Sequence, residues 1–217
     1  MTLATDRETL AMLPSKPTDE QRAVYVERII DMYRRATPAQ ILAGQDWYPA
    51  AHRLATEYGD TRRGAGIIAA LSANKGWGEN IRLARQAFNG VFYGHFADAL
   101  GKARRIHEGE DPANVLPMGT KTGHFFQCIA DPADPDAVVI DRHAHDVVAG
   151  MKYGSDDRGL KSPLRYASIA DAYRAGGKRL SMTPSVLQAV VWVVATDLAR
   201  NSRALVGISG WGVEVAT

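Results

Sequence analysis

The sequence of 217 residues contains a single cysteine, Cys128. One thiol cannot form an intramolecular disulfide, and it cannot supply the several thiolates of a zinc or iron–sulfur site. The sequence also lacks an apolar run long enough to span a membrane and an N-terminal apolar core behind a basic flank. These absences predict a soluble protein that is not exported and does not enter a membrane.

A marked excess of positive charge is missing as well. The 26 Lys and Arg residues are nearly balanced by 24 Asp and Glu residues, which leaves a formal net charge of +2. A strong non-specific binder of nucleic acid usually has a clearer basic excess, so any DNA contact depends on local clusters. Each cluster is also typical of a solvated helix end. The clusters are Arg62-Arg63, Lys102 with Arg104-Arg105, Lys152 with Arg158 and Lys161, and Lys178-Arg179.

Apolar residues recur mostly at helical spacing, and the pattern predicts about nine to eleven helices with short connections. Apolar residues make up 46% of the chain, enough for one sizeable core or two small lobes. Thr18 and Gln21 form a capping-box pattern at the start of the first helix. We therefore expect an all-α protein in which residues 1–217 form one unit, with a flexible arm over about residues 1–16.

Proline and glycine set several expected helix boundaries. The helix that Thr37-Pro38 opens should break around Pro49, and a later helix should end at Gly176-Gly177. Other helices are expected over residues 63–74 and 92–106. Pro184 opens the last long helix, which is apolar almost all round from Val186 to Ala195 and should therefore be deeply buried.

The segment around which the chain is organised begins at Leu116. Pro117 and Gly119 predict a tight turn, and Thr120 is placed to help open a helix that includes Phe125 and Ile129 and has Lys121 near its start. Pro132 and Pro135 should end this helix near residue 131, and an apolar run over residues 137–140 then leads to Asp141 at the start of another helix.

A lysine and an aspartate at neighbouring helix starts can share a cleft. A partly desolvated lysine is a nucleophile toward sugar or carbonyl carbon, and a nearby carboxylate can stabilise a developing cation. The simpler interpretation is that Asp141 caps its helix and Lys121 faces solvent, because charged side chains are mostly exposed.

These motifs resemble the hairpin and catalytic segment of the helix-hairpin-helix DNA glycosylases, most closely the 8-oxoguanine branch. Gly119-Thr120-Lys121 is similar to the hairpin that carries the nucleophilic lysine, and Asp141-Arg142-His143 to the Asp-x-His that follows. The resemblance implies that Lys121 is the nucleophile, that Asp141 supports it, and that His143 contacts a phosphate. The hairpin differs from the family pattern Leu-Pro-Gly-apolar-Gly, because it is one residue shorter and lacks the first glycine.

Two further motifs follow the family's order. Ser72-Ala73-Asn74 is similar to the turn whose amide enters the duplex where a nucleotide is extruded, which implies that Asn74 fills the gap. Gln188 and Trp192 resemble the pair that reads the edge and covers the face of the extruded purine. From the residues alone, the Asn74 turn is a simple connector, and Gln188 is a buried amide that forms a hydrogen bond with the backbone.

The resemblance covers roughly residues 64–200 and implies a two-lobed helical glycosylase fold. It implies a bifunctional DNA glycosylase and AP lyase that extrudes an oxidised purine, with 8-oxoguanine as the expected lesion, and excises it through a lysine Schiff base. The expected partner is duplex DNA with a damaged base, the protein is expected to be a monomer, and no cofactor is required. His143 and His145 fall on different faces of a predicted helix, so no metal site is predicted.

Two alternatives stay open at this point. The first is an enzyme that modifies an extruded base without excising it, as in glycosylase-like proteins of the hypermodified-thymine pathway in phage DNA. The second is a non-catalytic module that binds damaged DNA. All three predict a cytoplasmic protein that acts at a bacterial nucleoid or is encoded by a phage.

Overall fold

The structure is a computed structural model that describes residues 11–205, with side chains described as far as Leu198. Within this range the regular elements are all helices, so the protein is all-α, as the apolar spacing predicts. The helices are α1 (Asp19–Arg34), α2 (Pro38–Thr56), α3 (Thr61–Ala70), α4 (Trp77–Phe88), α5 (Ala97–His107), α6 (Pro112–Val115), α7 (Lys121–Ala130), α8 (Arg142–Ala149), α9 (Pro163–Leu180) and α10 (Pro184–Leu205).

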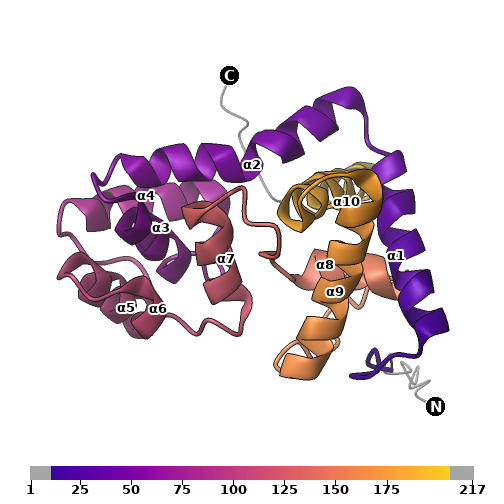
Figure 1. Cartoon of the computed structure of the whole chain (residues 1–217). Helices are drawn as coiled ribbons and strands as arrows, with labels where there is room; N and C mark the ends of the chain where they lie inside the picture. Colours follow the sequence, from indigo (N-terminus) through magenta and orange to yellow (C-terminus); the bar gives the residue numbers. More distant parts are fainter. Residues whose placement is uncertain (1–10, 206–217) are drawn as a thin grey trace, which may run out of the picture.

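The helices form two groups, each with its own buried apolar core (Figure 1). We call α3 to α7, with the C-terminal half of α2, the hairpin lobe, and α1, α8, α9 and α10 the terminal lobe. The first core contains Ile67, Ile68 and Phe126, and the second contains Ile29, Ile169 and Tyr173. Helix α2 runs along both groups (Figure 1), so it is one of the elements that join them.

The buried run over residues 137–140 passes between the two cores. Ala137 and Val139 belong to the core of the hairpin lobe, whereas Val138 and Ile140 belong to that of the terminal lobe. Successive side chains of an extended segment point in opposite directions, which explains the alternation. The run therefore holds the start of α8 at the junction of the lobes.

Helix α2 continues through Pro49, so the expected break there is wrong. A proline within a helix removes one hydrogen bond. Packing on both sides of Pro49 offsets this loss, because Tyr48 and Ala51 are both buried. Closer to its start, α2 crosses α10 at Gly44, where an added Cβ would lie 2.5 Å from the Cα of Val190.

Helix α9 likewise continues through Gly176-Gly177 to Leu180, which corrects the expected end. Both glycines are buried, and a Cβ at Gly177 would lie 2.7 Å from the carbonyl oxygen of Met182. The glycines therefore allow the chain to approach closely as it turns into α10.

Two other boundaries differ from expectation. Helix α3 ends at Ala70, before a turn in which Asn74 has a φ of 56°, and α5 begins at Ala97. Gly90 and Gly94, with φ of 75° and 85°, make residues 91–96 a loop.

The N-terminal caps agree better with the sequence pattern. Thr18 with Gln21 and Thr37 with Gln40 form complete capping boxes. Residues 1–10 of the expected arm lie outside the described residues. The carbonyl oxygen of Ala11 accepts a hydrogen bond from the Tyr153 hydroxyl, so the following residues are held against the terminal lobe.

No single helix among the described residues is both long and apolar enough to cross a membrane. Residues 163–180 and 184–198 reach that length and hydropathy only as a pair, which is bent by 100°.

Candidate functional site

The hairpin before α7 places Lys121 at the first position of that helix. The backbone N–H of Thr120 donates to the carbonyl oxygen of Pro117 at 3.0 Å, which closes the turn. The Thr120 hydroxyl donates to the same oxygen at 2.8 Å, so it does not cap α7 as the sequence predicted. Gly119 is exposed, and no atom would lie within 4 Å of a Cβ added there.

Gly123 fixes the hairpin against α7. A Cβ at this buried glycine would lie 2.3 Å from the Cα of Met118, closer than any real side-chain contact. Only glycine permits this approach between the helix and the hairpin backbone. The position of Lys121 is therefore set by backbone packing one turn further along α7.

The Lys121 side chain is exposed and has no partner. Within the described part of the hairpin lobe, every other Lys or Arg has an ion pair or, for Arg104, lies over an aromatic ring. Because no carboxylate pairs with this ammonium group, no ion pair has to break before Lys121 reacts or binds an anion. Lys121 is thus the basic side chain of this lobe that is available to a ligand.

Asp141 caps the N-terminus of α8. Its Oδ1 atom accepts hydrogen bonds from the backbone N–H groups of His143 at 2.9 Å and Ala144 at 2.8 Å. Both bonds go to one carboxylate oxygen, and the side chain is half-buried. The geometry therefore confirms the capping role of Asp141, and it fixes the direction of the carboxylate.

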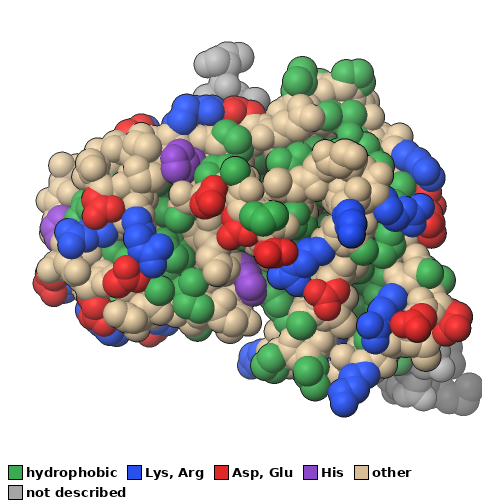
Figure 2. Space-filling view, viewed as in Figure 1, with side chains coloured by type: hydrophobic (Ala, Val, Ile, Leu, Met, Phe, Trp, Pro, Cys, Tyr) green, Lys and Arg blue, Asp and Glu red, His purple; other side chains and the backbone are tan. Residues whose placement is uncertain are grey.

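A contact between the lobes connects the neighbourhoods of Lys121 and Asp141. His124, one turn after Lys121, stacks on Tyr166 of α9, with the ring centroids 5.1 Å apart and the planes inclined by 11°. The Tyr166 hydroxyl accepts a hydrogen bond from the backbone N–H of Ile140 at 2.9 Å. Ile140 directly precedes Asp141. Figure 2 shows the surface hollowed between the two lobes, with acidic and basic side chains nearby.

Burial controls the protonation of both stacked rings. It lowers the pKa of His124, and the positive charge of Arg174 acts in the same direction. Burial also raises the pKa of Tyr166, and the negative charge of Asp141 acts in the same direction. Both rings are consequently neutral near neutral pH. No local sequence pattern predicts this pair, because the two residues lie on helices far apart in the chain.

His143 is half-buried beside the Asp141 carboxylate. Its Nε2 atom accepts a hydrogen bond from Arg142 at 3.1 Å, and burial lowers its pKa although Asp141 opposes the shift. The phosphate contact of His143 stays a prediction.

The next turn of α8 holds a buried charge network. His145 contacts Asp146 at 3.0 Å, and Arg158 donates to both oxygens of that carboxylate at 2.7 and 2.8 Å. Burial tends to raise the pKa of Asp146, but the bonds from His145 and Arg158 outweigh it and hold the pKa at about 2. This network attaches the loop over residues 150–162 to α8.

Gln188 lies inside the protein, as the apolar helix around it predicts. It is buried, and its Oε1 atom accepts a hydrogen bond from the Tyr48 hydroxyl at 3.1 Å. The partner is thus a side chain on α2, where the sequence predicted a backbone group. Trp192 is half-buried, and its ring lies 6.0 Å from that of Trp47.

An aromatic cluster connects the three elements that carry the sequence motifs. Trp47 contacts Trp77 at the start of α4 and Trp192 on α10, and the neighbouring Tyr48 contacts Phe125 on α7. Asn74 itself is exposed in the turn before α4.

The basic clusters found in the sequence are partly neutralised. Arg62 pairs with Asp111, Arg105 with Glu110 and Arg179 with Glu27. Lys152, Lys161 and Lys178 of the other clusters are exposed and, like Lys121, form no ion pair within the described residues. Among the residues that the structure describes, no group of three His, Cys, Asp or Glu side chains is arranged to hold a metal ion.

The comparisons with known proteins identify a family. A family model described as "Family of unknown function (DUF7178)" matches residues 12–201. No curated protein and no solved structure gives a significant match.

Proposed function

This chain belongs to the family of unknown function DUF7178, and we propose that it is a DNA glycosylase with AP lyase activity that acts on an oxidised purine. The observation that carries the proposal is the unpaired amine of Lys121 at the start of α7. Through the His124–Tyr166 stack and the Tyr166–Ile140 hydrogen bond, this helix meets the segment that ends in the Asp141 carboxylate.

The start of α7 also suits a phosphate of the DNA backbone. No side chain caps α7, and the backbone N–H groups of its first turn point out of the helix end. Such groups and the helix dipole favour an anion. The exposed Gly119 and Thr120 leave the approach to them open. A phosphate bound here would hold the sugar of an extruded nucleotide near Lys121.

In the proposed reaction the Lys121 amine attacks C1′ of the extruded nucleotide, and the damaged base leaves with the electron pair of the glycosidic bond. Asp141 stabilises the cationic sugar or assists the loss of a proton from Lys121. Ring opening then gives a Schiff base between Nζ and C1′. Loss of the C2′ proton breaks the C3′–O bond, so the strand is cut by β-elimination. Each step uses only the chain and its substrate.

A second candidate is an enzyme that modifies an extruded base without excising it. Gln188 favours this alternative, because its carbonyl oxygen already accepts from Tyr48 and the side chain is buried. To read the edge of 8-oxoguanine, Gln188 would have to meet the base at this buried position, beside its bond to Tyr48. A glycosylase-like enzyme for another base would leave the Gln188–Tyr48 pair intact.

Borohydride trapping on a panel of lesion-bearing duplexes tests the proposal. The parent protein should form a covalent adduct and cut the strand, whereas Lys121→Gln should do neither and still bind lesion DNA, because the amide preserves length and removes the amine. Asp141→Asn should still form the adduct but about a hundredfold or more slowly, the usual effect of losing one electrostatic stabiliser. Asparagine caps helices as well as aspartate, so the variant should keep its stability.

The result also separates the alternatives. Adduct formation by Lys121→Gln at the parent rate would place the nucleophile elsewhere. A parent protein that binds duplexes but forms no adduct with any lesion would exclude the lyase and favour the base-modifying enzyme or a non-catalytic DNA-binding module.

A further inference from the structure

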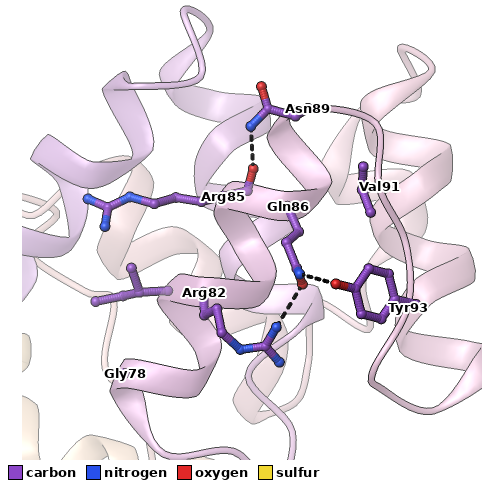
Figure 3. Close-up of a pocket in the computed structure, with 8 residues that line it drawn as sticks. Gly78, Arg82, Arg85, Gln86, Asn89, Val91 and Tyr93 are labelled. Atoms are coloured by element: carbon purple, nitrogen blue, oxygen red, sulfur yellow. Dashed lines mark hydrogen bonds between the residues drawn. The ribbon is translucent and has the colours of Figure 1, made fainter.

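A second concave surface lies on the hairpin lobe and shares no residue with the candidate site. It has a volume of about 630 Å³ and is lined by one face of α4, from Gly78 to Asn89, and by Val91 and Tyr93 of the following loop (Figure 3). We call it the α4 pocket. It is shallow and open to solvent, so it suits a flat group that lies against its wall.

The loop wall of the α4 pocket is apolar and exposed. Val91 and Tyr93 are 43% and 58% exposed. Two exposed apolar side chains on one wall of a concave surface offer a ligand an apolar contact. The flat face of Tyr93 is therefore available to another planar group.

Polar side chains hold the Tyr93 ring in place. The Gln86 amide donates to the Tyr93 hydroxyl at 2.8 Å, and Arg82 donates to the Gln86 carbonyl oxygen at 3.1 Å. Figure 3 shows Arg82 and Gln86 turned toward Tyr93 and Arg85 turned away from it. The pocket thus combines an aromatic face with an amide and a guanidinium group at one side.

The loop is also fixed to the turn that contains Asn74. The Lys75 ammonium donates to the carbonyl oxygen of Gly94 at 3.3 Å. The backbone N–H of Val91 donates to the backbone carbonyl oxygen of Gln86 at 2.9 Å. Because these bonds order the loop in the free protein, a ligand would lose little affinity through ordering it.

The charges around the pocket favour a neutral ligand over a free anion. Arg82 pairs with Glu79, and Arg85 pairs with Glu57. A planar, uncharged ring with polar edges suits the remaining chemistry, because it can stack on Tyr93 and form hydrogen bonds beside it. A nucleobase has these properties, and stacking on an aromatic side chain tolerates any base.

We propose that the α4 pocket is a second DNA contact that takes one unpaired nucleobase, with its ring on Tyr93 and its polar edge toward Gln86 and Arg82. The inference rests on the proposed function in taking DNA as the ligand. It adds a site for single-stranded DNA that is separate from the chemistry at Lys121.

Binding of a fluorescent oligothymidylate to the full chain tests the pocket. Tyr93→Ala should weaken binding about fivefold to a hundredfold, the effect of losing one aromatic stacking partner. Tyr93→Phe keeps the ring and should bind within about twofold of the parent. Phe96→Ala is the matched control, because Phe96 is an equally exposed aromatic of the same loop that does not line the pocket. Equal binding by Tyr93→Ala and the parent would overturn the inference.

Photocrosslinking identifies the contact directly. An oligothymidylate that carries one 5-iodouracil should crosslink to Tyr93, and a crosslink confined to other residues would refute the pocket. Borohydride trapping on lesion duplexes is scored separately. Adduct formation without Tyr93-dependent binding defeats only the pocket, whereas Tyr93-dependent binding without any adduct defeats only the glycosylase.

Discussion

Buried polar side chains decide much of the behaviour expected of single residues. Gln188 is such a residue, because a side chain inside an apolar helix must find a partner or lose stability. Its partner is the Tyr48 hydroxyl, which lies on another helix and is itself buried. The pair therefore ties α2 to α10 by one specific hydrogen bond.

Gln188→Ala should lower the free energy of unfolding by about 1–3 kcal/mol, because the Tyr48 hydroxyl is left buried without this acceptor. Urea unfolding measures the change. Tyr48→Phe removes the donor, and a double-mutant cycle with Gln188→Ala should show coupling between the two positions. Additive losses would mean that the bond contributes nothing. A Gln188→Ala protein of parent stability that no longer discriminates damaged from normal guanine would instead support the base-reading role.

His124 makes stability depend on pH. Its pKa is lowered chiefly by burial, so below its ordinary pKa of about 6.5 the unfolded chain binds more protons than the folded protein. The stabilisation is complete above that pH and is lost as the pH falls toward the lower pKa of the folded state. We expect the free energy of unfolding to decrease between about pH 7 and about pH 5.

The variant His124→Phe keeps a flat ring against Tyr166 and removes the titration, so this decrease should become shallower. Urea unfolding at a series of pH values measures the slope. Some slope should persist, because burial also lowers the pKa of His143 and His95. Identical slopes for the variant and the parent would show that His124 titrates normally.

At the scale of elements, the hairpin and α7 form one packed unit, because Gly123 of α7 lies directly against the backbone of Met118 in the hairpin. The contact holds Lys121 in a defined place at the start of α7. Helix α8 is fixed in a different way, through the Asp141 cap and the buried run over residues 137–140.

Gly123→Ala should destabilise the protein by about 1–3 kcal/mol, the usual cost of overpacking, because its Cβ would meet the Met118 backbone. Gly119→Ala is the matched control and should change stability little, since the position is open and its φ is not positive. Thermal or urea unfolding of the two variants measures the difference. Equal stability of both would contradict the close approach of α7 to the hairpin.

At the scale of the whole molecule, α2 and α10 cross closely at Gly44. Helix α2 packs into the core of the hairpin lobe and α10 also packs into the core of the terminal lobe, so this crossing connects the two lobes. Gly44→Ala would place a Cβ 2.5 Å from Val190, so we expect it to lower the free energy of unfolding by about 1–3 kcal/mol. In Gly101→Ala the new Cβ meets nothing within 4 Å on an exposed face of α5, and alanine in a helix should stabilise by up to about 1 kcal/mol. Opposite signs in urea unfolding are expected, and a neutral Gly44→Ala would argue against the tight crossing.

Local rules were sufficient for the class of the protein and for many of its helix starts. Capping boxes at Thr18 and Thr37, and the cap at Asp141, depend only on residues within one helical turn, so the sequence predicts them. The burial of Cys128 and Gln188 likewise follows from the apolar residues around them. The unpaired state of Lys121 does not follow, because only the fold shows which carboxylates lie near each basic residue.

Tertiary packing decided the remainder. Local sequence rules predict that Pro49 and Gly176-Gly177 end their helices. Burial against neighbouring helices outweighs the local loss of helix stability, so α2 and α9 continue. The Tyr48–Gln188 bond and the His124–Tyr166 stack join residues far apart in the chain, for which no local pattern exists. The sequence by itself therefore determined the all-α class and predicted the candidate site residues, whereas the packing of two cores against each other decided which distant side chains pair, as Tyr48 does with Gln188 and His124 with Tyr166.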